Sequence, residues 1–138
     1  MKESVNVPIC VGERLYARWG FVPILKDLLA EYLMPDILWT GGITKLYKIS
    51  ALAESFYVPV SPHDAGDPIN ILAWAHTMMT VLNFYKLEII YPSLNLLNSM
   101  IDEPLNINNG KIQLTTRPGL EINLDEEFIE AHLYNDWK

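Results

Sequence analysis

Residues 8–13, Pro-Ile-Cys-Val-Gly-Glu, form a short apolar run that ends in a carboxylate, and three later apolar runs also end near an ionisable residue. The four ionisable residues are Glu13, Asp36, His63 and Glu88, which recur at intervals of 23 to 27 residues. A strand, a helix and two turns occupy about that much chain. The spacing therefore predicts successive βα units of a parallel barrel.

In such a barrel the carboxyl ends of the strands form one mouth, where chemistry is done. We therefore expect the three carboxylates and the imidazole to converge on one rim, which is typical of a reactive site. A closed barrel of eight units needs roughly 250 residues, whereas this chain has 138. The predicted fold class is α/β: four units that make half of a TIM-type (β/α) barrel, followed by a C-terminal tail.

The pattern of apolar residues predicts the elements of each unit. We expect strands over 7–11, 36–40, 57–61 and 84–90, because these runs are short and apolar. Helical spacing predicts helices that begin near residue 21, after Gly41-Gly42 and at Pro68, the second of them running to about Phe56. Beyond Pro92 the rhythm ends, with a turn at 106–110, a strand at 111–115 and a helix at 125–134 capped by Asp125. We thus divide the chain into a half barrel at 1–92 and a tail at 93–138.

Composition excludes several classes of function. The chain is 50% hydrophobic and 20% charged with a net charge of −7, so it offers no basic surface for nucleic acid. No run approaches the roughly 20 apolar residues of a membrane span. Residues 1–4 lack the apolar core of a signal peptide, and we expect a cytoplasmic location. The expected partner is another protein or a small molecule.

Two glutamates are candidates for binding and catalysis. Glu13, at the mouth end of a buried strand, suits a Mg²⁺ ligand, and the alternative is an ion pair with Arg14 or Arg18. Glu88 interrupts the apolar string 87–90, where a buried carboxylate is costly unless it is paired or metal-bound. A purely structural role for Glu88 would need an arginine partner.

His63 is the candidate general acid or base. It follows Ser61-Pro62 at a strand end, and Asp36 on the adjacent strand is its natural partner in a His–Asp dyad. Asp64 competes for that position, and the alternative for His63 itself is an ordinary histidine of a surface loop. The matched register of Asp36 and His63 favours the dyad.

The remaining reactive residues are assigned structural roles. We expect the lone Cys10 to be a small buried hydrophobe, His76 to be packed inside and His132 to be solvated. Residues 125–127 are acidic and indicate a helix N-terminus rather than a metal site. The sequence has no phosphate-binding glycine loop, no Cys/His zinc spacing and no Gly-x-Ser-x-Gly motif.

Five motifs, in order, resemble those of the enolase superfamily. They are similar in particular to the sugar-acid (galactonate and gluconate) dehydratases of its mandelate racemase/muconate lactonizing-like branch. The resemblance extends from about Val7 to Tyr134 and rests on residues 8–16 (PICVGERLY), 35–37 (PDI) with 41–43 (GGI), 61–63 (SPH), Glu88, and 117–120 (RPGL). Asp67 and Glu121 depart from it, since relatives usually have glycine at both positions.

The resemblance implies a role for each rim residue. Glu13, ending barrel strand five, would be the third Mg²⁺ ligand, and Asp36, on strand six, would orient His63. His63, on strand seven, would abstract the proton α to the substrate carboxylate. Glu88, on strand eight, would hydrogen-bond the enolic intermediate or the substrate. The metal would stabilise the enediolate as it forms, because the α-proton of a carboxylate is very weakly acidic.

The resemblance also implies partners. The family's N-terminal capping domain, strands one to four, the two other metal ligands and the acid on strand three have no counterpart here, so the Mg²⁺ site is incomplete. In the family the tail packs on that capping domain. We expect a complementary N-terminal half or a homo-oligomer, a sugar-acid substrate once the site is complete, and no turnover by the chain alone. The alternative is a non-catalytic truncated remnant or a self-associating half barrel.

Overall fold

The computed structural model describes residues 4–134. The first two thirds contain β1 (Cys10–Val11), η2 (Arg18–Gly20), α1 (Val22–Lys26), β2 (Tyr32–Leu33), α2 (Ile37–Thr40), α3 (Ile43–Glu54) and α4 (Pro68–Met78). The last third contains η3 (Tyr91–Ser93), α5 (Leu94–Asn98), β3 (Ile107–Asn108), β4 (Lys111–Ile112) and α6 (Glu126–Ala131). Among these described residues, no helix has both the length and the apolar character needed to cross a membrane.

Four segments lie side by side in chain order and run parallel. β1 pairs with β2, with Val11 opposite Leu33. Leu33 also bridges Val60, which in turn bridges Phe84. The predicted strands at 57–61 and 84–90 are therefore reduced to bridging residues, and the predicted strand at 7–11 to its last two positions. Proline has no N–H to donate to a ladder, and it occupies positions 8, 35, 59 and 62 beside these pairings.

The predicted strand at 36–40 is wrong. Residues 37–40 form the one-turn helix α2, and the strand of this unit lies earlier, at Tyr32–Leu33. The side chain of Asp36 caps this helix, since its Oδ1 accepts from the backbone N–H of Leu38 at 2.7 Å and of Trp39 at 3.2 Å. Gly41 ends the helix with a φ of 100°, a left-handed conformation that glycine adopts without strain.

The three helices predicted within residues 1–92 are confirmed. The helix predicted near residue 21 is α1, which ends at Lys26. The helix predicted to reach Phe56 is α3, which ends at Glu54, and the Phe56 side chain beyond it is 38% exposed. α4 begins at Pro68 as predicted, and Asp67 caps it by accepting from the N–H of Asn70 at 2.9 Å.

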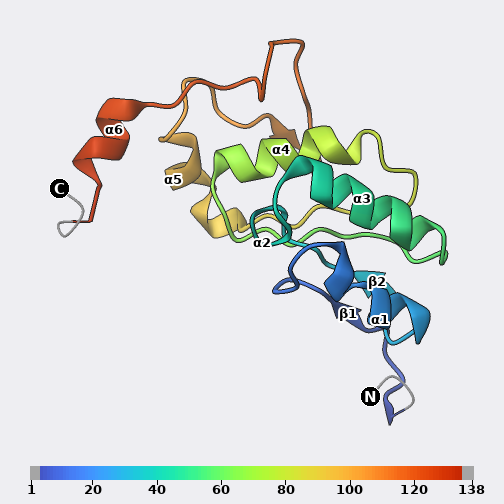
Figure 1. Ribbon diagram of the computed structural model, residues 1–138. Coiled ribbons are helices and arrows are strands. Elements are labelled where there is room, and N and C mark those ends of the chain that lie inside the picture. The colour runs from blue at the N-terminus through green and yellow to red at the C-terminus, as the bar shows by residue number, and fades with distance from the viewer. Residues whose placement is uncertain (1–3, 135–138) are drawn as a thin grey trace.

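Three apolar clusters form the core. The first joins the parallel segments to α1 and α3, the second joins α2, α3 and α4, and the third joins α4 to the tail through Leu97, Ile101 and Leu105. Figure 1 shows α3 and α4 side by side, in agreement with the contacts between them. The helices therefore hold the parallel segments in place from one side, and the tail adds to that layer.

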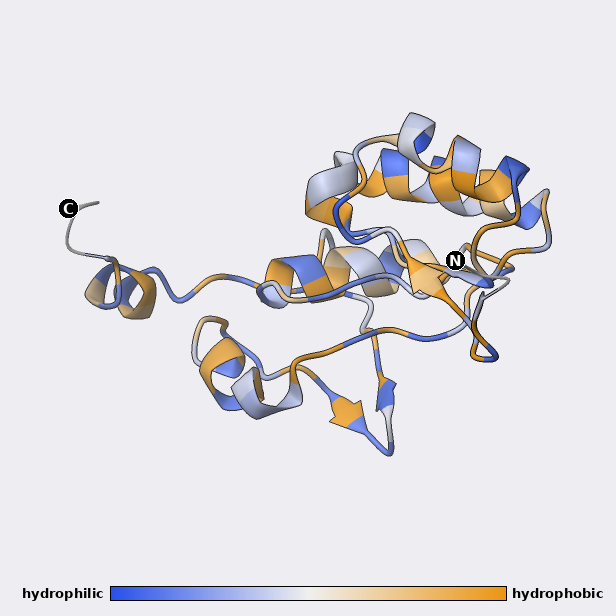
Figure 2. Cartoon of the chain, turned by 90° about the horizontal axis from the view of Figure 1, so that it is seen from below, coloured by the Kyte–Doolittle hydropathy of each residue, from blue (hydrophilic) through white to orange (hydrophobic). Residues whose placement is uncertain are grey.

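The tail forms a hairpin and a terminal helix. β3 and β4 pair antiparallel around Asn109 and Gly110, both at positive φ, as a tight hairpin turn requires. Asp125 caps α6 as predicted, by accepting from the N–H of Phe128 at 2.9 Å, and the helix ends at Ala131. Figures 1 and 2 both show α6 at the end of an extended stretch that leads away from α3 and α4.

Candidate functional site

The structure brings the four predicted side chains together at one end of the parallel segments. Nδ1 of His63 lies 3.0 Å from Oδ2 of Asp36. Its other ring nitrogen, Nε2, lies 3.8 Å from Oε2 of Glu13 and 4.0 Å from Oε2 of Glu88. We call these four residues the rim. They meet because Asp36 and His63 are themselves bridged in parallel register, just beyond the paired segments.

The Asp36 carboxylate is held on both of its oxygens. Oδ1 caps α2, Oδ2 contacts the His63 ring, and only 5% of the side chain is exposed. The backbone N–H of His63 donates to the carbonyl of Pro35 at 3.1 Å, which fixes the base of the ring. A carboxylate only accepts hydrogen bonds, so it selects the tautomer with a proton on Nδ1. In the neutral imidazole, Nε2 therefore presents its lone pair to the two glutamates.

The two glutamates are much less constrained. The side chains of Glu13 and Glu88 are 49% and 42% exposed. Nε of Arg14 lies 3.4 Å from Oε1 of Glu13, so the predicted alternative of an ion pair is present at the surface. The other suggested partner, Arg18, lies instead over the Trp19 ring, 3.7 Å from its centroid.

The prediction that Glu88 is buried in a central strand is wrong for the described chain. The segment after Phe84 has no further strand pairing among residues 4–134, so this carboxylate remains open to solvent on one side. No arginine is needed to hold it, because its Oε2 accepts from the backbone N–H of Asp64 at 3.1 Å.

Asp64 does not compete for His63. Its side chain is buried and turns into the loop, where Oδ1 accepts from the N–H of Gly66 at 3.1 Å and from Nδ2 of Asn70 at 2.8 Å. Burial raises the pKa of the Asp64 carboxyl, the two hydrogen bonds oppose that rise, and the charges of Asp36 and His63 act in opposite directions. Sequence reasoning missed Asn70, whose partner is six residues away and whose role depends on the loop's shape.

The rim does not form a metal site by itself. Mg²⁺ takes six oxygen ligands in near-octahedral geometry, usually several of them waters. Glu13 offers one carboxylate, whereas Asp36 is committed to its helix and to His63. Across residues 4–134 there is no group of three or more His, Cys, Asp or Glu side chains placed to hold a metal ion. Of the predicted residues, Glu13 is the one that the sequence assigned as a metal ligand.

Two of the other predictions need correction. Cys10 is exposed rather than buried, because successive side chains of a strand point to opposite faces, and Val11, on the other face, is the more buried of the two. Partial burial of the thiol and the charge of Glu88 raise the pKa of Cys10, so the reactive thiolate is disfavoured. His76 is only partly buried, and its Nε2 lies 3.5 Å from Oε1 of Glu121. His132 is exposed, as predicted, and stacks on Phe128.

Glu121 and Asp67, the two departures from the family pattern, both have structural roles. Asp67 caps α4, as described above. Glu121 adopts a φ of 72°, a left-handed conformation that glycine usually supplies. Its carboxylate is buried and accepts a hydrogen bond from the backbone N–H of Thr115. Neither residue lies among the rim side chains.

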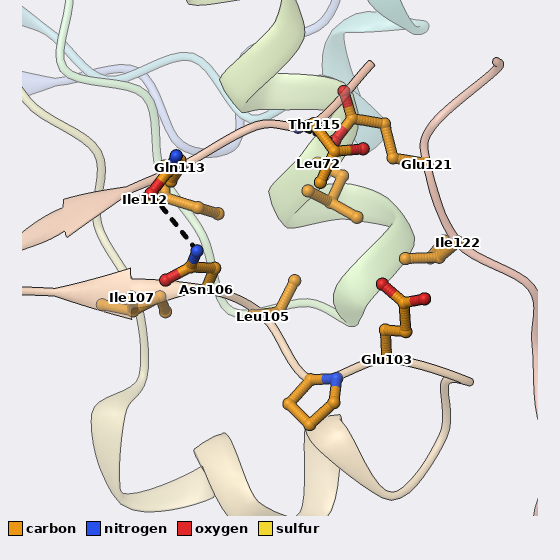
Figure 3. A pocket seen from close by; sticks show the side chains of 11 residues that line it. Leu72, Glu103, Leu105, Asn106, Ile107, Ile112, Gln113, Thr115, Glu121 and Ile122 are labelled. Carbon is orange, nitrogen blue, oxygen red and sulfur yellow. Dashed lines mark hydrogen bonds between the residues drawn. The ribbon is translucent and has the colours of Figure 1, made fainter. Parts of the chain in front are cut away.

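A separate hollow lies between α4 and the tail. It has a volume of about 510 Å³, and Figure 3 shows Glu121 and Thr115 at one end of it and Asn106 and Gln113 at the other, beside the hairpin. None of the rim residues lines it. The hollow is therefore not part of the candidate site.

Comparison with known sequences identifies what the chain resembles. The family described as "Enolase C-terminal domain-like" matches residues 1–128. The D-xylonate dehydratase of Haloferax volcanii is 31% identical over 131 residues, which cover 95% of this chain and 32% of that protein. The D-galactonate dehydratase of Variovorax paradoxus is 33% identical over 145 aligned residues, which cover 98% of this chain and 37% of that protein. The chain thus spans about a third of the length of these curated relatives.

Solved structures agree with these sequence matches. A mandelate racemase/muconate lactonizing enzyme-like protein from Rubrobacter xylanophilus superposes with a TM-score of 0.90 at 33% identity, over 98% of this chain and 35% of that one. An enolase from Agrobacterium radiobacter, described as a candidate galactarate dehydratase and solved with sodium and L-malate bound, superposes with a TM-score of 0.85 at 27% identity. That match covers 94% of this chain and 36% of that one.

Proposed function

Because the chain belongs to the enolase C-terminal domain-like family, we propose that its rim supplies the proton-abstracting part of the active site of a sugar-acid dehydratase. The names of its sequence relatives, D-xylonate and D-galactonate dehydratase, support this substrate class. The observation on which the proposal depends is the 3.0 Å contact between Asp36 Oδ2 and His63 Nδ1, which turns Nε2 toward the two glutamates. The resemblance to the superfamily expected from the motifs is confirmed by the family match.

In this proposal His63 is the general base. The Cα–H bond next to the substrate carboxylate breaks, Nε2 takes the proton, and the electron pair forms an enediolate. The buried Asp36 carboxylate keeps the ring oriented and stabilises the imidazolium that results. Loss of the 3-hydroxyl as water then needs a proton from a general acid, which the rim residues are not proposed to supply.

Glu88 is proposed to bind the substrate or the enolic intermediate, and Glu13 to contribute one ligand to a Mg²⁺ site. Oε2 of Glu88 lies within 4.0 Å of the base, on the side of the ring from which a substrate would be attacked. Since Glu13 is one carboxylate, we propose that water and the complementary N-terminal half supply further ligands. Mg²⁺ would stabilise the negative charge of the enediolate.

We also propose that the four parallel segments correspond to strands five to eight of a (β/α) barrel, within a half barrel at residues 1–92, and that 93–138 form a separate tail. The four segments pair in parallel and in the same order as along the chain, which supports this correspondence. A largely apolar hollow of about 520 Å³ next to Glu13, lined also by Ile9, Val11 and Leu15, supports a complementary half that covers β1. A homo-oligomer is the other candidate partner, and the cytoplasmic location stays a prediction.

The proposal can be tested by mixing this chain with an N-terminal half taken from one of the dehydratases named above. We expect Mg²⁺-dependent formation of the 2-oxo-3-deoxy acid from D-xylonate or D-galactonate only in the mixture, and none from the purified chain alone. His63→Asn should abolish the product while the circular dichroism spectrum stays unchanged, because asparagine cannot take the proton. The product can be measured as its semicarbazone.

Three other outcomes would each contradict one part of the proposal. Full turnover by the His63→Asn mixture would show that another residue is the base. A mixture in which the two halves associate but no product forms would favour the alternative of a non-catalytic remnant. Robust dehydration by the purified chain alone would contradict the expected need for a complement.

A further inference from the structure

Asp64 is a buried carboxylate that the proposed chemistry does not use. It is 2% exposed, and the donors that reach its side chain are amides, from Gly66 at 3.1 Å and Asn70 at 2.8 Å. A buried charge is costly unless it is paired or well hydrogen-bonded. Its presence directly after His63 therefore calls for a physical reason.

The backbone of the same residue reaches the rim. The N–H of Asp64 donates to Oε2 of Glu88 at 3.1 Å, and this is the carboxylate oxygen that lies 4.0 Å from Nε2 of His63. Asp64 thus has its side chain bonded to α4 and its main chain bonded to the rim. A shift of the loop would move the N–H away from Glu88, whose side chain is 42% exposed.

Asn70 is the residue that fixes this loop. It lies in the first turn of α4 and is 2% exposed, and Asp67 binds its backbone N–H at 2.9 Å. A Cβ at position 66 would lie only 2.6 Å from Nδ2 of Asn70, so the amide can approach because residue 66 is glycine. Oδ1 of Asn70 is buried and has no hydrogen-bond partner among residues 4–134. An apolar side chain would avoid that cost, so the amide is explained by what its Nδ2 donates to.

We propose that Asn70 is a positioning residue for Glu88, acting through Asp64. Its side chain holds the 63–66 loop so that the Asp64 N–H keeps Oε2 of Glu88 beside the free nitrogen of His63. The catalytic meaning of this arrangement rests on the proposed function, but the hydrogen-bonded relay itself does not. A misplacement of about 1 Å at such a site can lower a rate by about a hundredfold.

The relay can be observed in the purified chain by ¹H–¹⁵N NMR as a function of pH. An amide that donates to a carboxylate shifts when that carboxylate ionises, so the Asp64 amide should follow Glu88, and Glu88→Gln should remove that response. In Asn70→Ala we expect less than half of the response and about tenfold faster hydrogen exchange at Asp64, since a net hydrogen bond is lost. If the alanine variant does not fold, Asn70→Leu can replace it, because leucine is similar in size to asparagine and lacks the unpaired oxygen. We expect the same reduced response and faster exchange in that variant.

Two further variants separate positioning from a general loosening of α4. Asp67→Ala removes the cap of the same helix without touching Asp64, and should keep the amide response. Asp64→Asn keeps an oxygen acceptor for Gly66 and Asn70, and should also keep it. A full response in the folded Asn70 variants, an equal loss in Asp67→Ala, or no Glu88-dependent response in the unmodified chain would overturn the inference. None of these signals requires turnover, so failure of the dehydratase proposal would be seen separately.

Discussion

The rim has an inner pair, Asp36 and His63, and an outer pair, Glu13 and Glu88, and the two pairs are held in different ways. The inner carboxylate is almost fully buried and accepts three hydrogen bonds from this chain. The outer carboxylates are about half exposed, with Arg14 beside one and the Asp64 amide on the other. The orientation of the His63 ring is therefore fixed within this chain, whereas the outer carboxylates remain accessible to solvent.

The difference between the two pairs concerns how far each side chain is oriented before any ligand binds. A base that is oriented before the substrate arrives costs no reorganisation during the reaction. The desolvation cost of burying Asp36 is offset because the same carboxylate also caps and stabilises α2. The outer glutamates, by contrast, are about half exposed, and the Asp64 amide reaches only one of them.

Asp36→Ala should produce the largest loss and most directly break the inner pair. We expect the free energy of unfolding to fall by about 2.5–4 kcal/mol, since losing a helix cap costs about 1 kcal/mol and a hydrogen bond to a charged group about 1.5–3 kcal/mol. Urea unfolding measured by circular dichroism would test this. Asp36→Asn, which keeps an acceptor for the cap, should lose less. Equal stability of the alanine variant and the unmodified chain would show that the inner pair is not structurally held.

Asp64→Asn should have a smaller effect of opposite sign. The pKa of Asp64 is raised above its ordinary value of 3.8, chiefly by burial. The folded state therefore disfavours the ionised form, and this penalty is fully present above the folded pKa and disappears below 3.8. We expect the asparagine variant to be more stable than the unmodified chain at pH 7, with the gain vanishing as the pH falls below 3.8. Urea unfolding midpoints of both proteins, measured over a pH series, test this. An asparagine variant that is less stable than the unmodified chain at pH 7 would contradict the prediction.

Glu13→Gln should have the smallest effect and sharpen the contrast. Because the side chain is half exposed and its Arg14 partner is on the surface, we expect the free energy of unfolding to change by no more than about 0.5 kcal/mol. Thermal unfolding beside Asp36→Asn, the matched amide substitution in the inner pair, provides the comparison. A loss at Glu13 as large as that at Asp36 would remove the distinction between the two pairs.

The site was easier to predict than the elements around it. The spacing of Asp36 and His63 was sufficient to place them together, because parallel segments in chain order bring equivalent positions to the same end. The same pattern wrongly assigned residues 36–40 to a strand. Ile37 and Leu38 are apolar residues typical of a buried strand, but they lie in a one-turn helix that Asp36 caps. The exposure of Cys10 was not predicted, because a continuous apolar run does not indicate which face of the strand is covered by other elements.

By itself, the sequence determined the parallel order of the four segments, the four residues that meet at the rim, and the family resemblance. These depend on residue type and spacing along the chain, both of which are visible without coordinates. Only the tertiary structure decided that Asp36 is shared between a helix cap and His63, that Glu88 is exposed and held by the Asp64 amide, and that Asn70 fixes the loop behind them. Those features arise from contacts between separate elements, where a fraction of an ångström decides whether a hydrogen bond forms.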